Sequence, residues 1–304
     1  MSVIKNVVVA GASGILGAPV LNALLDSKQF NVSVLTRHDS KSQFSSDVRV
    51  IPVHYDNRAE LTTALQGQDA VVSTLSSAAL GFEIPLIDAA IATGVKRFIP
   101  SEFGSDTDNA KSSTLPVYQT KVAVDKALQQ KAREYPNFSY TSIRNGVFLD
   151  WGLAFGFHVN FKSENPVFYD GGDRPFSSTT LATIGKSVVS VLTHLQETKN
   201  KAIFVHDLVT TQQQVLSIAR KIAPARKWEP VTVSTADLEA QSQEQYSKGI
   251  ISLESSLGFL TRAVFAEGYG GRFKHVDNEL LGIGFKTEAD LEELVKATLT
   301  GSAA

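Results

Sequence analysis

The fold of this chain is decided near its N-terminus, by the stretch Val7-Val8-Val9-Ala10-Gly11-Ala12-Ser13-Gly14-Ile15-Leu16-Gly17. Its apolar first part has the composition of a buried strand, and glycines spaced G-x-x-G-x-x-G lead into a helical segment. Gly11 allows a sharp turn, Gly14 leaves room for a pyrophosphate, and Gly17 allows close helix–strand packing. The N–H groups that begin the helix would face that anion. An ordinary βα turn has a similar composition, but the strand–turn–helix context favours a dinucleotide-binding turn over residues 11–17.

Composition excludes several classes of protein. With 304 residues, 43% hydrophobic and 20% charged, the chain is typical of a soluble protein with one large domain and a smaller one. The 29 basic and 31 acidic residues leave a net charge of −2, so no nucleic-acid partner is expected. There is no cysteine, and therefore neither a disulfide nor a zinc–thiolate site. No apolar run is long enough for a bilayer, and the first strand leaves no room for a signal peptide, so we expect a cytoplasmic protein without a membrane partner.

A second buried strand covers residues 31–37 and ends in Thr36-Arg37. An acidic side chain at this point would bind the ribose 2′-hydroxyl of NADH, whereas an arginine suits the 2′-phosphate of NADPH. Lys41 adds a second cation nearby. We therefore predict NADPH as the cofactor, bound in part by Thr36, Arg37 and Lys41. Asp39 is the alternative, as an acid that binds the ribose of NADH.

Strands and helices alternate along the first half of the chain. Strands are expected at 48–53, 69–77, 95–104 and 139–144, and helices at 15–27, 58–65, 84–93 and 116–135. This alternation with short connections predicts an α/β fold, a Rossmann-type doubly wound parallel sheet. Ligands of such sheets bind outside the carboxyl ends of the strands, so Ser76 and Ser77 should border the cofactor.

Arg97-Phe98-Ile99-Pro100-Ser101-Glu102-Phe103-Gly104, taken together with the glycine turn, resembles the isoflavone reductase-like family. This group includes phenylcoumaran benzylic ether reductases and pinoresinol–lariciresinol reductases, and it merges with the NmrA-like family of atypical short-chain dehydrogenases. The resemblance covers residues 7 to about 148. It implies an NADP(H)-binding Rossmann domain over 1–150, to which some later segments return, and a smaller α/β substrate domain over 151–304. It also implies NADPH, and we expect Ser101, Glu102 and Phe103 in its site.

Lys121 is the candidate acid–base residue. It falls within an apolar stripe of the helix predicted at 116–135, between Val117 and Val124. An unpaired ammonium on such a face is costly, so it either transfers protons there or bends its stem to reach water. The resemblance implies the first role, because the family carries its catalytic lysine on the helix after the Pro-Ser-Glu-Phe-Gly loop. It also implies that Lys121 contacts the cofactor.

The tyrosine–lysine pair of ordinary short-chain dehydrogenases, Y-x-x-x-K, is missing from this sequence. Tyr118 precedes Lys121 by only three residues and is predicted at most to assist it. This departure argues against a standard carbonyl reductase or a nucleotide-sugar epimerase.

Further site residues follow the sixth predicted strand. The resemblance places Asn145, Gly146 and Phe148 near the nicotinamide. Residues 151–158 are rich in aromatic residues and glycine, which suits a pocket wall for a flat substrate, although a buried helix has the same composition. The predicted substrate contacts are Phe103, Phe148, Trp151 and His158. The six histidines are scattered without metal-ligand spacing, so no metal site is expected.

The second half has a looser pattern. A hairpin is expected over 166–178 around Gly171-Gly172, helices at 180–196, 211–222 and 287–299, and a strand at 202–206. Together these features predict an NADPH-dependent reductase that transfers hydride to a small aromatic, enone, ketone or quinone-methide-like substrate, with Lys121 as general acid/base. The alternatives are a non-catalytic NmrA-like redox sensor that acts through a protein partner, and a redox-neutral isomerase. The oligomeric state is left open.

Overall fold

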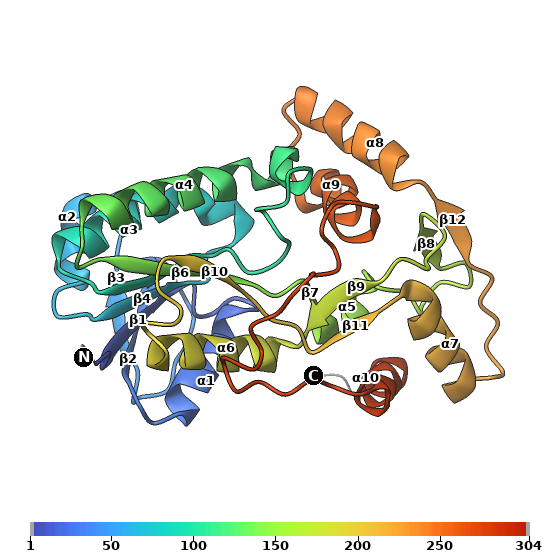
Figure 1. Ribbon diagram of the computed structural model, residues 1–304, viewed down its shortest axis with the longest axis horizontal. Helices are drawn as coiled ribbons and strands as arrows, with labels where there is room; N and C mark the ends of the chain where they lie inside the picture. Colours follow the sequence, from blue (N-terminus) through green and yellow to red (C-terminus); the bar gives the residue numbers. More distant parts are fainter. Residues whose placement is uncertain (1–2, 302–304) are drawn as a thin grey trace.

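The computed structural model describes residues 3–301. Residues 1–2 of the first predicted domain and residues 302–304 of the second lie outside it. Its centre is a seven-stranded sheet (Figure 1). The strands are β1 (Asn6–Ala10), β2 (Asn31–Thr36), β3 (Arg49–Pro52), β4 (Ala70–Ser73), β5 (Arg97–Ile99), β6 (Ser139–Arg144) and β10 (Lys201–Phe204).

The strands lie in the order β10-β6-β5-β4-β1-β2-β3, and every neighbouring pair is parallel. β1, β4 and β6 are buried almost throughout, as expected for strands covered by helices on both faces. The strand order reverses between β1 and β4, which is the point where ligands of open α/β sheets bind. The predicted Rossmann-type doubly wound fold is confirmed.

Helices cover both faces of this sheet. One face carries α1 (Gly17–Asp26) and α6 (Leu181–Thr193), and the other carries α2 (Arg58–Ala64), α3 (Glu83–Ala92) and α4 (Gln119–Glu134) (Figure 1). α6 and the edge strand β10 come from the second half of the chain. The sheet is therefore completed by residues far from those that begin it.

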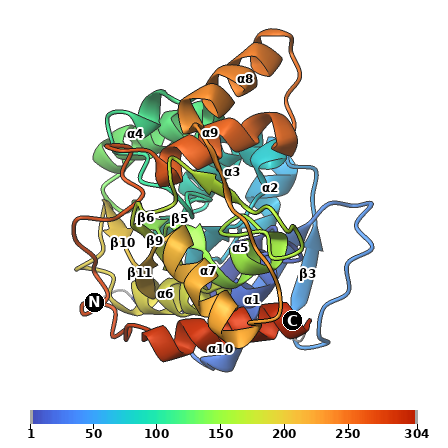
Figure 2. The same cartoon turned by 90° about the vertical axis from the view of Figure 1, so that its right-hand side faces the viewer.

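The remaining elements that follow β6 in the chain pack beside the carboxyl edge of the sheet (Figure 1). β7 (Val147–Phe148), β9 (Phe176–Thr179) and β11 (Leu208–Thr210) form one small sheet, and β8 (Val167–Tyr169) and β12 (Val231–Val233) form another. α7 (Gln212–Ile222) packs against α10 (Glu288–Thr300), as Figure 2 shows. The other helices are α5 (Leu149–Phe155), α8 (Thr235–Ser247) and α9 (Leu253–Phe265).

The hairpin predicted over 166–178 is wrong. β8 pairs with β12 in parallel, and β9 pairs with β7 and β11. The Asp170 carboxylate accepts hydrogen bonds from the backbone N (2.8 Å) and Oγ1 (2.6 Å) of Thr235, which hold the end of β8 against the start of α8. Turn residues indicate where a chain bends, but they do not specify which strand pairs with which. Here each strand pairs with one that is distant in sequence, and not with its neighbour along the chain.

Gly185 allows α6 to lie directly on α1. A Cβ at this position would come within 2.8 Å of both Ala23 Cβ and Pro19 O. We expect Gly185→Val to lower the free energy of unfolding by about 1–3 kcal/mol through overpacking, measured by urea denaturation. Gly284→Val is the matched control, because a Cβ there meets nothing within 4 Å. Equal losses in the two variants would contradict this account of the helix contact.

Candidate active site

The glycine turn between β1 and α1 has the shape that a pyrophosphate site requires. Gly11 has φ +80, and a Cβ on Gly17 would lie 2.1 Å from the carbonyl oxygen of Gly11. Around Gly14 a Cβ would meet only that same oxygen, at 3.4 Å, and Gly14 itself is exposed. Leu16, the N-cap of α1, makes no side-chain capping bond. Ala18 N already donates to Gly14 O at 3.0 Å, and Pro19 has no N–H. The N–H groups that can meet an anion are therefore those of the turn that leads into α1, and this turn fits a dinucleotide.

The other residues of the turn complete this shape. Ser13 and Ile15 are exposed, whereas Ala12 and Leu16 are buried and anchor the turn in the core of the sheet.

The predicted 2′-phosphate residues lie at the open end of β2. Thr36 is half-buried, and Arg37 and Lys41 are exposed. The Nε atom of Arg37 lies 3.6 Å from Asp39 Oδ1, and both side chains are more than 75% exposed. Arg37 is therefore free to reorient toward a phosphate, with Asp39 as the acidic alternative beside it.

The ends of β1, β4 and β5 are tied together by hydrogen bonds. Thr74 N donates to Ala10 O at 2.8 Å, and Ser101 Oγ donates to Leu75 O at 2.8 Å. Ser76 and Ser77 follow directly and are exposed at this edge. These hydrogen bonds keep the glycine turn, the two serines and the loop after β5 next to one another at the carboxyl edge of the sheet.

A cleft of about 200 Å³ opens at the same edge. It brings together six of the residues predicted from the sequence: Ser77, Phe103, Lys121, Gly146, Phe148 and Trp151. Tyr118, which the sequence analysis predicted at most to assist Lys121, also lines the cleft. The sequence analysis did not predict the remaining lining residues as part of the site: Gly104, Ser105, Val117, Val147, Phe157, Leu253, Leu257, Leu260 and Val264.

Four of these additional residues form one face of α9. Leu253, Leu257, Leu260 and Val264 recur at helical spacing, so a search for this period would have found the helix. Its place over the cleft, however, is a tertiary contact between residues more than a hundred positions apart in the chain.

Lys121 stands in the first turn of α4, half-buried, and donates from Nζ to the carbonyl oxygen of Phe103 at 3.3 Å. Burial lowers the pKa of Lys121, and the positive charge of Arg144 adds to this effect. The carboxylates of Glu102 and Glu83 oppose it. The ammonium therefore faces an apolar cleft with a weakened hold on its proton, as a proton donor requires.

Tyr118 lies next to Lys121 on the cleft wall. Its hydroxyl is 2.8 Å from Ser105 Oγ, and burial raises the pKa of Tyr118 to about 12. The phenol therefore keeps its proton at neutral pH and can donate a hydrogen bond.

Three predicted cofactor residues are buried behind the cleft. Glu102 forms an ion pair with Arg144 and accepts from Thr107 Oγ1 at 3.2 Å. Ser101 holds the loop through Leu75, and the backbone N of Asn145 donates to Gly104 O at 3.2 Å. The side chains of Ser101 and Glu102 and the backbone of Asn145 thus support the loop 101–105 that forms the cleft wall.

Contrary to the prediction, His158 does not reach the cleft. It is fully buried, its Nε2 lies 3.1 Å from Ser178 Oγ, and burial lowers the pKa of His158 to about 4. Its ring fills the space that a side chain on Gly152 would need, since a Cβ there would come within 2.1 Å of the ring. The imidazole is a neutral packing group under α5.

Glu83, the first residue of α3, is a buried carboxyl group that the sequence analysis did not single out. Its Oε1 accepts from Ser73 Oγ and from the backbone N of Ser101. Within residues 3–301, its Oε2 has no hydrogen-bond partner. Burial raises the pKa of Glu83 to about 7, although both hydrogen bonds lower it.

Comparison with known proteins identifies the family. The model of the NmrA-like family matches residues 4–259. The chain belongs to the NmrA-like family. It is 32% identical over 303 residues to oxidoreductase aprR of Aspergillus flavus, covering 97% of this chain and 99% of the relative. It is 34% identical over 249 residues to oxidoreductase poxI of Penicillium oxalicum, covering 79% and 77%. These relatives confirm the predicted enzyme class, oxidoreductase.

Plant reductases are similar as well. Phenylcoumaran benzylic ether reductase PT1 of Pinus taeda is 30% identical over 162 residues, which covers 49% of this chain and 51% of that protein. The predicted resemblance to the isoflavone reductase-like group is confirmed.

Several solved structures share the fold of this NmrA-like chain. AtPrR2 with NADP⁺ and (+)pinoresinol has a TM-score of 0.75 at 19% identity, covering 98% of this chain and 99% of that chain. The complex of leucoanthocyanidin reductase with NADPH from Vitis vinifera has a TM-score of 0.74 at 21% identity, covering 96% and 99%. Those two proteins were solved with NADP⁺ and with NADPH, respectively. Among residues 3–301, no helix combines the length and apolar composition needed to cross a bilayer.

The buried Glu83 carboxyl group gives a pH-dependent prediction. Its pKa is about 7 in the folded chain and 4.5 ordinarily, so the folded state binds this proton more tightly. As pH rises through that interval, the free energy of unfolding should fall by roughly 3 kcal/mol from this group. Urea denaturation at pH 5 and pH 8 should show a larger loss in the wild type than in Glu83→Gln.

Glu134→Gln, at the exposed end of α4, is the matched control and should keep the pH dependence of the wild type. The same slope in Glu83→Gln would refute the role given to this carboxyl group.

Proposed function

We propose that this chain is an NADPH-dependent reductase of small aromatic or conjugated substrates, with Lys121 as its general acid/base. The observation that carries the proposal is the position of this one ammonium group. Lys121 faces an apolar, aromatic cleft at the carboxyl edge of the sheet, where the glycine turn also lies. Placing a charged amine in apolar surroundings costs free energy of folding. A catalytic role would explain why the chain keeps one there.

The cofactor would be held along this edge. Residues 11–17 would bind the pyrophosphate, and Thr36, Arg37 and Lys41 would bind the 2′-phosphate. Ser76, Ser77, Phe103 and Phe148 would border the remainder, while Ser101, Glu102, Asn145 and Gly146 would hold the wall against which it rests. When bound, NADPH supplies a hydride.

The cleft walls suit a flat apolar substrate. The Trp151 and Phe155 rings are stacked, with centroids 4.7 Å apart at 11°, and Phe148 meets Trp151 edge-on at 6.4 Å. α9 contributes an aliphatic wall opposite. The named substrates of the relatives, a phenylcoumaran benzylic ether and pinoresinol, are aromatic. We infer an aromatic or conjugated substrate in contact with Phe103, Phe148 and Trp151.

Lys121 would supply the proton that balances hydride transfer. A hydride brings an electron pair to the substrate carbon, and the electrons that it displaces collect on a conjugated oxygen. The Lys121 ammonium would donate its proton to that oxygen and become a neutral amine. Because the side chain is only half-buried, it can regain a proton from solvent. Tyr118 would assist by a hydrogen bond without giving up its own proton.

Replacing the amine tests this assignment. We expect Lys121→Met to lower turnover about 10²-fold or more, because the proton donor is lost, while NADPH binding weakens far less, because the other cofactor contacts remain. Turnover is followed as NADPH consumption with a panel of aromatic, enone and ketone compounds, and binding by fluorescence titration. Lys126→Met, an exposed lysine of the same helix, is the control and should keep full activity.

The outcomes separate the candidate functions. Full turnover in Lys121→Met removes the lysine from the mechanism but leaves a reductase. NADPH binding without turnover of any compound by the wild type would favour the redox sensor. Product formed without cofactor oxidation would favour the isomerase.

Arg37 should decide between the two cofactors. We expect Arg37→Ala to weaken NADPH binding roughly tenfold and NADH binding little, because only NADPH carries the 2′-phosphate. Dissociation constants for both are measured by titration. Arg49→Ala, at the amino end of β3, is the exposed control. An unchanged preference in Arg37→Ala, with weaker NADH binding in Asp39→Ala, would support Asp39 as the ribose ligand instead.

A further inference from the structure

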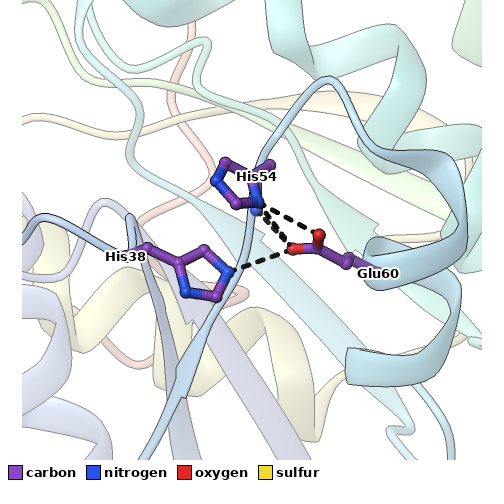
Figure 3. Close-up of side chains that lie close together, drawn as sticks. All are labelled: His38, His54 and Glu60. Carbon is purple, nitrogen blue, oxygen red and sulfur yellow. Dashed lines mark hydrogen bonds and ion pairs between the residues drawn. The ribbon is translucent and has the colours of Figure 1, made fainter.

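Three side chains meet beside the open end of β2, outside the cleft (Figure 3). His38 follows β2, His54 follows β3, and Glu60 lies in the first turn of α2. They come together because β2 and β3 are parallel neighbours and α2 follows β3 directly. The histidines are far apart in sequence, so their spacing gave no sign of a ligand group.

Both imidazoles direct a ring nitrogen at the same carboxylate. His38 Nε2 lies 3.1 Å from Glu60 Oε2, and His54 Nδ1 lies 3.0 Å from Oε1 and 3.1 Å from Oε2. Each of the three residues offers one atom that could bind a metal ion, and these three atoms all lie within 4.8 Å of one another. The two rings are stacked with centroids 4.2 Å apart, which fixes their relative orientation.

The carboxylate is held in place by its surroundings. Asn57 Nδ2 donates to Glu60 Oε1 at 2.8 Å, and the backbone N of His54 donates to Oε2 at 2.8 Å. These two bonds fix the orientation of the carboxylate toward the two rings. Ligands oriented by hydrogen bonds from neighbouring groups are typical of metal sites.

We propose that His38 Nε2, His54 Nδ1 and the Glu60 carboxylate bind a Zn²⁺ ion, with water at the fourth position. Two imidazole nitrogens and one carboxylate are a ligand set that zinc favours. In a tetrahedral site with zinc bonds near 2.0–2.1 Å, ligand atoms lie roughly 3.3 Å apart. Each ring nitrogen is already 3.0–3.1 Å from a Glu60 oxygen, and all three ligand atoms lie within 4.8 Å of one another. The side chains are 48%, 60% and 34% exposed, so an ion reaches them from solvent.

Binding requires only a change of tautomer. The ring protons that now point at Glu60 move, through solvent, to the other nitrogen of each imidazole, and zinc takes the vacated lone pairs. The ion would then link the ends of β2 and β3 to α2. Because the unfolded chain holds these three residues apart, zinc bound here should also stabilise the fold.

Zinc titration of the tag-free, metal-stripped full chain tests the site. Calorimetry with ZnCl₂ at neutral pH should show one ion per chain. Binding should weaken about tenfold or more in each of His38→Ala, His54→Ala and Glu60→Gln, since each loses a ligand. His275→Ala, an exposed histidine elsewhere, is the control and should bind as the wild type does.

Thermal unfolding provides the second readout. Zinc should raise the Tm of the wild type and of His275→Ala, but not that of the double variant His38→Ala/His54→Ala. No binding by the wild type, or equal binding by the double variant, would overturn the proposal. Neither measurement involves NADPH or turnover, so failure here leaves the proposed reductase function untouched.

Discussion

The buried ion pair between Glu102 and Arg144 holds together the edge of the sheet at which the cleft opens. It joins the loop after β5 to the end of β6, and both side chains are almost fully buried. Removing one partner of such a pair typically costs about 3–5 kcal/mol, because the other charge is left uncompensated. The pair therefore sets the position of the loop whose carbonyl groups hold Lys121 and the backbone of Asn145.

Two distant parts of the chain meet at that loop. The first half supplies the glycine turn, the strand ends and the lysine, all at one edge because the strands are parallel. The second half supplies the aromatic residues of α5 and the aliphatic face of α9. The strand ends and the opposite cleft wall thus come from different parts of the chain, so one can change in sequence without the other.

The Rossmann sheet and much of the candidate site could be predicted because their signals are local. The turn at residues 11–17 needs glycine wherever it occurs, and buried parallel strands have continuous apolar sequences. Lys121 stood out as a charge within an apolar stripe. Arg144, in contrast, is unremarkable in sequence, and its importance comes from a buried partner 42 residues away. The false hairpin over 166–178 has the same origin, since turn residues do not specify a pairing partner.

Local patterns are enough to predict the parallel strands of the first half, the dinucleotide turn and the helical position of Lys121, because each of these signals lies within one strand, turn or helix. Tertiary packing places α9 over the cleft, buries His158 under α5, and brings His38, His54 and Glu60 together. Such groupings depend on which surfaces pack together. That choice is made by the free energy of the whole chain, through contacts between segments that no local pattern records.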